Sequence, residues 1–222
     1  AGSGPTATVT NSALSGSLGA TVNAGATLNL AGSTVRGTGT GTGLTSGAGV
    51  ALSNGTLNVT QGSRIEGTQR GISINGTSAG TNTVVIDGSQ VSASAGPALD
   101  IVGTANADIT LGNGTTLTAS NGMAVQVAAR ATATVAITGS TIEGDLVAQT
   151  QGPFTGTLDV SLGGGAALRG AILNGNSVAL AVTSDGAPGD ALEAVKLVTL
   201  RNVRGGLPVN TVAAPSTPGQ LK

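Results

Sequence analysis

The fold is decided by a unit that residues 56–67 show most clearly, where the chain reads TLNVTQGSRIEG. Leu57 and Val59 alternate with polar residues, which is the period-two pattern of a β-strand with one buried face. A turn at Gly62-Ser63 follows, and a second alternation begins at Ile65. The unit therefore predicts two short strands joined by a tight turn.

The same turn recurs along the chain as a small residue, a hydroxyl or second small residue, one variable residue and an aliphatic residue. The copies open at Asn11, Gly32, Gly62, Gly88, Gly114, Gly139 and Gly165. A period of roughly 26 residues without a helical pattern is typical of a solenoid. Such a unit cannot bury its apolar face alone, but stacked units pair each strand with the strands above and below.

We therefore predict an all-β fold: a right-handed parallel β-helix of about seven to eight coils over residues 1–200. Right-handedness follows from the strong preference for right-handed crossovers between parallel strands. Pro208, Pro215 and Pro218 break the pattern, and residues 201–222 are predicted to form an irregular tail or capping segment.

Apolar pairs before successive turns are expected to stack in the core. The pairs are Leu28 and Leu30, Leu57 and Val59, Val84 and Ile86, Ile109 and Leu111, Val135 and Ile137, Leu158 and Val160. A further alternation after the turns predicts another strand in several coils. It is seen at Ile72-Ser73-Ile74, Leu99-Asp100-Ile101 and Val125-Gln126-Val127.

Charged residues follow the aliphatic residue of several turns. Like positions of stacked coils lie only about 4.8 Å apart. In the predicted register Arg36 lies beside Glu66 and Glu143 beside Arg169. Because opposite charges meet in both cases, we interpret these four residues as structural ladder pairs.

Composition excludes several functions. The 222 residues include 38 Gly and one Phe, but no His, Cys, Trp or Tyr, so histidine-based hydrolysis, thiolate chemistry and His- or Cys-ligated metals are excluded. With 9 Lys and Arg against 10 Asp and Glu and no aromatic platform, nucleic acid is not expected as a partner. No apolar run approaches the ~20 residues of a membrane-spanning helix, so the chain is not expected to insert into a membrane.

Carboxylates are the candidate catalytic groups, because β-helices also carry carbohydrate-active enzymes. Glu66 and Glu143 would lie about 14 Å apart at the spacing of stacked coils, beyond the roughly 5–9.5 Å of glycosidase pairs. Asp87, Asp100 and Asp108 could hold Ca²⁺ in a lyase, but they occupy different strand and turn positions. We predict no catalytic residue, cofactor or metal site, and keep a secreted polysaccharide lyase or hydrolase as an alternative.

Two insertions interrupt the repeat and predict surface loops, at residues 37–49 and 148–157. The candidate partner-contact residues in them are Thr38, Thr40, Thr42, Thr45, Gln151 and Phe154. Three Asn-Gly-Thr sequences, which match the glycosylation sequon, are interpreted as tight turns. They begin at Asn54, Asn75 and Asn113.

A family resemblance is carried by Ile65-Glu66-Gly67 and Ile142-Glu143-Gly144 in Gly-Ser-rich turns, and by residues 144–171 with their Pro-bearing insertion. The chain resembles autotransporter passenger domains of the pertactin-like kind. The resemblance implies a right-handed β-helix exported to the surface of a Gram-negative bacterium or beyond it, and anchored in the full-length protein by a C-terminal barrel. No Arg-Gly-Asp tripeptide is present, so integrin recognition is not carried over.

The resemblance also implies a non-enzymatic adhesin. Its partner would be a host cell-surface or matrix component, or a second copy of the chain. The barrel is not recognisable within the 222 residues, so we expect a passenger or a piece of one. An inert spacer that displays another segment stays open beside the lyase alternative.

Overall fold

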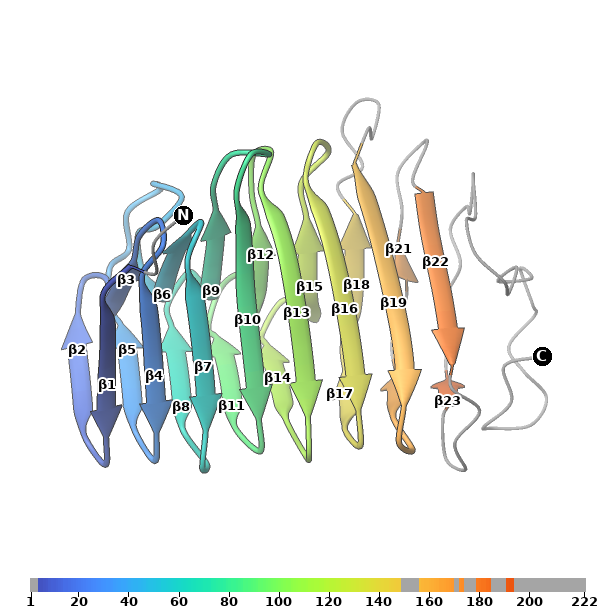
Figure 1. Cartoon of the computed structure of the whole chain (residues 1–222), viewed down its shortest axis with the longest axis horizontal. Coiled ribbons are helices and arrows are strands. Elements are labelled where there is room, and N and C mark those ends of the chain that lie inside the picture. The colour runs from blue at the N-terminus through green and yellow to red at the C-terminus, as the bar shows by residue number, and fades with distance from the viewer. Residues whose placement is uncertain (1–3, 149–155, 170–171, 174–178, 185–190, 194–222) are drawn as a thin grey trace.

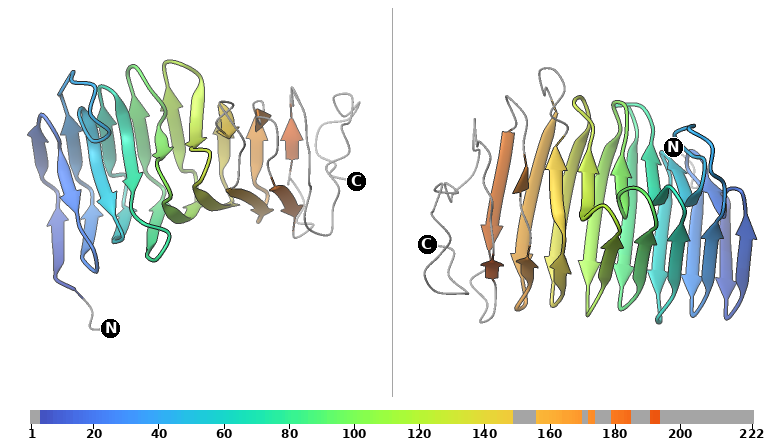
Figure 2. Two further views of the ribbon diagram at one scale, coloured as in Figure 1. Left: turned by 90° about the horizontal axis from the view of Figure 1, so that it is seen from above. Right: turned by 180° about the vertical axis from the view of Figure 1, so that it is seen from behind.

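The computed structural model describes residues 4–148, 156–169, 172–173, 179–184 and 191–193. In this part of the chain all regular structure is β-strand, and every strand pair is parallel. Successive strands of each sheet stack side by side along the long axis of the molecule (Figures 1 and 2). The predicted all-β parallel β-helix is therefore confirmed.

Three faces run along the solenoid. The first sheet contains β1 (Thr6–Thr10), β4 (Thr27–Ala31), β7 (Thr56–Thr60), β10 (Thr81–Asp87), β13 (Asn106–Gly112), β16 (Thr132–Thr138), β19 (Thr157–Gly163) and β22 (Ala179–Ser184). The second sheet contains β2 (Ala13–Gly16), β5 (Thr34–Gly37), β8 (Arg64–Gly67), β11 (Gln90–Ala93) and β14 (Thr116–Ala119).

The third sheet contains β3 (Ala20–Val22), β6 (Ala48–Ser53), β9 (Arg70–Asn75), β12 (Leu99–Ile101), β15 (Met123–Val127), β18 (Asp145–Ala148) and β21 (Ile172–Leu173). A fourth sheet, which takes the place of the second later in the chain, contains β17 (Thr141–Glu143), β20 (Ala167–Arg169) and β23 (Ala191–Glu193). Residues 201–222, predicted as a tail, lie outside the described residues.

The solenoid completes about five turns, slightly fewer than the seven to eight that the repeat predicts. On the second face, the ladder of the second sheet stops at β14 and a separate sheet begins at β17. The break coincides with a register shift between Met123 and Val125, where β15 carries one residue more than its neighbour β18. A bulge of this kind bends a strand and interrupts pairing.

The core lies between the three faces and is filled by stacked aliphatic side chains. Val35, Ile65 and Val91 follow one another in register on the second sheet, and Ile72 and Leu99 do so on the third. All five are buried. The predicted stacking holds up to β16 but is wrong at its last pair.

The last predicted pair was placed two residues too early. Val160 stacks on Val135 and Leu162 on Ile137, whereas Leu158 stacks on Ala133. In the other coils the first residue of the pair lies four or five residues before the turn, as Val160 does before Gly165, so the prediction began one alternation too early at Leu158.

At the corner between the first and second faces, a residue with a positive φ is followed by a residue with a buried hydroxyl group. The residue that opens the turn has a positive φ in every copy of the turn that the structure describes, for example 70° at Gly62 and 48° at Asn11. The next residue points inward: Ser63 Oγ donates to Thr60 O at 2.6 Å and accepts from Ser33 N at 3.1 Å. These hydroxyls replace ladder partners that the turning backbone loses. The buried members are Ser33, Ser63, Ser89, Thr115 and Ser140.

Candidate functional site

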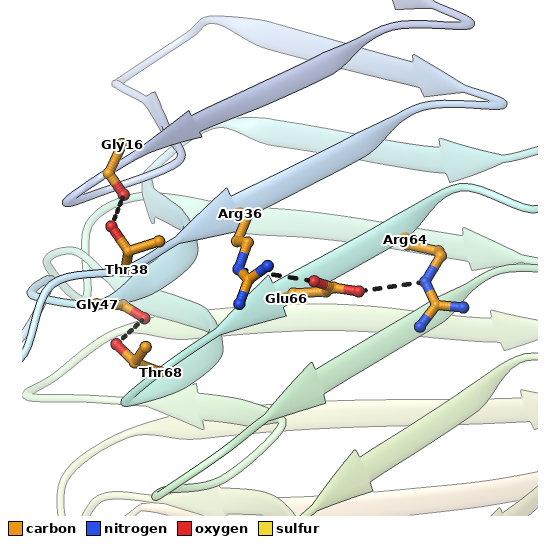
Figure 3. A network of polar contacts seen from close by, with 7 residues as sticks. All are labelled: Gly16, Arg36, Thr38, Gly47, Arg64, Glu66 and Thr68. Atoms are coloured by element: carbon orange, nitrogen blue, oxygen red, sulfur yellow. Dashed lines mark hydrogen bonds and ion pairs between the residues drawn. The ribbon is translucent and has the colours of Figure 1, made fainter.

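The charged ladder, defined here as Arg36, Arg64 and Glu66, lies on the outer surface of the second sheet (Figure 3). Arg36 and Glu66 are partners in register, and Arg36 Nε lies 3.9 Å from Glu66 Oε2. The predicted pair is therefore confirmed. Arg64 Nε donates to Glu66 Oε1 at 3.3 Å.

Arg64 was missed by the sequence reasoning, although the period of two in β8 places it on the same face as Glu66. The two arginine side chains are 60% and 53% exposed, against 30% for Glu66. Exposed pairs of this kind contribute little to stability. The charged ladder therefore leaves two accessible guanidinium groups around a single carboxylate.

The second predicted pair is in register as well. Glu143 of β17 and Arg169 of β20 are Cα partners, and the ladder continues to Glu193 of β23. Opposite charges thus alternate at this position of the fourth sheet. Glu193 was not predicted, because the turn motif is no longer recognisable in that coil.

The threonine loop, defined here as residues 38–47, connects β5 to β6. Thr38, Thr40, Thr42 and Thr45 are all exposed on it, as expected for partner-contact residues. The loop ends at Gly47 rather than at residue 49, because Ala48 already belongs to β6 and is buried. The other candidates, Gln151 and Phe154, lie outside the described residues.

Both ends of the threonine loop are tied to neighbouring coils by hydrogen bonds. Thr38 donates to Gly16 O through its backbone N at 2.8 Å and through Oγ1 at 3.0 Å. Thr68 Oγ1 contacts the carbonyl oxygens of Gly39 and Gly47, the latter at 3.5 Å. Figure 3 shows Thr38 and Thr68 in these positions. The ends of the loop are thus fixed by these hydrogen bonds.

The middle of the threonine loop lies against the outer surface of the third sheet. Ser73 Oγ of β9 donates to Leu44 O at 2.8 Å, and Arg70 Nη1 donates to Gly43 O at 3.4 Å. Ser73 points outward from the sheet but is buried, because the loop covers it. Leu44 itself is 51% exposed.

Beneath this region Arg70 forms an ion pair with Asp100 of β12 through Nε and Oδ2. Asp100 is only 4% exposed. Burial raises the pKa of the Asp100 carboxyl above its ordinary value of 3.8, while the hydrogen bond and positive charge of Arg70 lower it in part. The sequence reasoning named Asp100 as a possible calcium ligand and did not foresee this pair.

The raised pKa of Asp100 has a consequence for stability. Folded Asp100 binds its proton more tightly than unfolded Asp100, so its contribution to stability is present below pH 3.8 and is lost as the pH rises through the folded pKa. We expect the free energy of unfolding of the wild type, minus that of Asp100→Asn, to increase as the pH is lowered from about 7 toward this range. Urea titrations of both proteins at about pH 7 and near pH 3.8 measure this difference in the free energy of unfolding. A decrease would show that Arg70 lowers the pKa of Asp100 by more than burial raises it.

The three carboxylates of the lyase alternative are held apart. Asp87 Oδ1, at the end of β10, accepts from Asn113 Nδ2 at 2.6 Å. Asp108 is exposed on the first sheet, whereas Asp100 lies on the third. Among the described residues no three His, Cys, Asp or Glu are grouped so that they could hold a metal ion.

No helix long and apolar enough to cross a membrane occurs in the described part of the chain.

Comparisons of the chain with protein-family models, with curated proteins and with solved structures gave no match.

Proposed function

We propose that this chain is a non-enzymatic passenger segment of a Gram-negative autotransporter, exposed at the cell surface or released from it. It acts in adhesion to a host cell-surface or matrix component, or in contact with a second copy of itself. The threonine loop carries the proposal, because it presents exposed hydroxyl groups outside the regular solenoid while both of its ends are hydrogen-bonded to neighbouring coils.

A loop with fixed ends suits a contact surface. Binding loses free energy when a mobile loop must be ordered, and a loop that is already anchored avoids part of that cost. Thr40, Thr42 and Thr45 are exposed there, while the two exposed guanidinium groups of the charged ladder lie on the adjoining strands β5 and β8. Several weak contacts on copies displayed together would add through avidity.

The test is a triple substitution of Thr40, Thr42 and Thr45 by alanine, which leaves the anchoring hydroxyl of Thr38 in place. We expect binding of the purified chain to matrix-coated surfaces and to host cell layers to fall at least about tenfold, since three lost hydrogen bonds at about 0.5–1.5 kcal/mol each sum to about 1.5 kcal/mol or more. The free energy of unfolding should not change. Sedimentation velocity on the same proteins measures contact between two copies.

The matched control replaces Thr8, Thr134 and Thr138, three exposed threonines of the first sheet, by alanine. The control should bind as the wild type does. Equal binding by the wild type, the triple variant of the loop and the control would show that the threonine loop does not contact the partner. Absence of both binding and self-association in the wild type would favour the inert spacer.

A further inference from the structure

Besides forming turns, Asn-Gly pairs can undergo a chemical reaction within the dipeptide. In this dipeptide the backbone nitrogen of glycine can attack the side-chain carboxamide of asparagine, because glycine has no side chain to shield it. The structure describes four such pairs, and Asn174-Gly175 lies outside the described residues. The four begin at Asn54, Asn75, Asn113 and Asn121. Their surroundings differ sharply.

Asn75 is the last residue of β9, and its side chain folds back toward the following peptide. Gly76 N donates to Asn75 Oδ1 at 2.8 Å. Since a carbonyl bond is about 1.2 Å long, the nitrogen lies within about 4 Å of the carboxamide carbon Cγ. Thr77 and Ser78, which follow, are exposed, so water reaches this end of the strand. The attacking and attacked groups are already adjacent.

At Asn113 the same two groups are occupied elsewhere. Gly114 N donates to Gly139 O at 3.1 Å and to Ser140 Oγ at 3.1 Å in the next coil. The carboxamide of Asn113 donates to Asp87 Oδ1 at 2.6 Å. The ladder therefore holds the nitrogen away from the carboxamide.

The two remaining pairs are restrained in other ways. Gly122 N donates to Ala119 O at 2.9 Å, while Asn121 Oδ1 accepts from Met123 N at 3.0 Å. Asn54 Oδ1 is buried without a hydrogen-bond partner, and Gly55 is buried too, so water does not reach this carboxamide oxygen. Both pairs lack the arrangement found at Asn75.

We propose that Asn75 is a self-modification site, which deamidates spontaneously through a cyclic imide while the fold protects Asn54, Asn113 and Asn121. Gly76 N loses its proton to solvent hydroxide and attacks Cγ of Asn75. The new C–N bond closes a five-membered ring, the bond from Cγ to Nδ2 breaks, and ammonia leaves with a proton from water. Water then opens the imide at either carbonyl, which gives aspartate or isoaspartate.

The product changes the end of the third sheet. A carboxylate replaces a neutral amide next to Gly103. A Cβ atom placed on that glycine would lie 3.8 Å from Asn75 Oδ1. The formal net charge of the chain at pH 7 is −1, so one added negative charge separates the product from the parent in an isoelectric gel. Isoaspartate also lengthens the backbone by one carbon between β9 and β10. This site is independent of the partner proposed above.

The experiment follows all four pairs in one protein. The full chain is incubated at mildly alkaline pH, folded in one sample and unfolded in concentrated urea in the other. Samples are digested at acidic pH, and fragment masses assign aspartate and isoaspartate to each position. In the folded sample we expect Asn75 to react at least about tenfold faster than the other three, because small displacements of reacting groups have large effects on rate. In the unfolded sample the four rates should be similar.

Two variants complete the test. Asn75→Gln should abolish the rapid acidic product, since the longer side chain cannot close the same ring, while Asn113→Gln should leave the product and its rate unchanged. The rate at Asn75 should rise with pH, because attack requires loss of the proton from Gly76 N. A folded-state rate at Asn75 no greater than those at Asn113 and Asn121 would overturn the proposal.

Discussion

Replacing Ile65 by alanine is expected to lower the free energy of unfolding by about 2–5 kcal/mol. Ile65 is fully buried in β8 between Val35 of the preceding coil and Val91 of the next. The substitution removes three carbon atoms from the centre of a stack that is paired on both sides. Because neighbouring coils are hydrogen-bonded in register, they can close the resulting cavity only in part.

The matched control for Ile65→Ala is Leu44→Ala in the threonine loop. Leu44 is also a large aliphatic residue, but it is half exposed, so its truncation should change stability by no more than about 0.5 kcal/mol. Equilibrium denaturation followed by circular dichroism measures both values. Equal effects at the two positions would contradict the assignment of Ile65 to the core.

Replacing Ser63 by alanine is expected to lower the free energy of unfolding by about 1–3 kcal/mol, although only one oxygen atom is removed. Ser63 Oγ accepts from the buried Ser33 N and donates to Thr60 O. Without the hydroxyl, that N–H loses its partner in an interior that water does not enter. The effect should be larger than the small difference in side-chain volume suggests.

The comparison for Ser63→Ala is Ser15→Ala, at an exposed position of β2 on the outer surface of the second sheet. Denaturation curves of the two variants and the wild type should place only Ser63→Ala at a lower midpoint. If Ser63→Ala were as stable as the wild type, the corner hydroxyls would be dispensable. One coil already has alanine at the equivalent position, because Ala166 follows Gly165 in the same turn motif and is buried.

The sequence alone predicts the register over most of the solenoid, because identical positions stack directly and must be compatible. The pairing of Arg36 with Glu66 and the stacking of Leu57 under Val84 follow from that constraint. The prediction was wrong at Leu158, because the alternation there runs through Leu158, Val160 and Leu162 and the pair was started at the first of them. It was also slightly too high in the number of coils.

The candidate site could be predicted only in part. Exposed threonines were expected from the insertion that interrupts the repeat after Val35, and the structure places Thr38, Thr40, Thr42 and Thr45 on the surface. The contacts of Ser73 with Leu44 and of Arg70 with Asp100 could not be foreseen, because they join residues about 30 positions apart whose meeting depends on how the loop folds back. A buried acidic residue in a strand gives no sign in the sequence of which arginine will reach it.

The central claim, that this chain is displayed outside the cell with its threonine loop exposed, is tested most directly by an antibody raised against residues 38–47 and applied to intact cells that produce the protein. The account predicts that intact cells bind the antibody and that brief protease treatment removes the signal. Binding that appears only after the cells are permeabilised would contradict it.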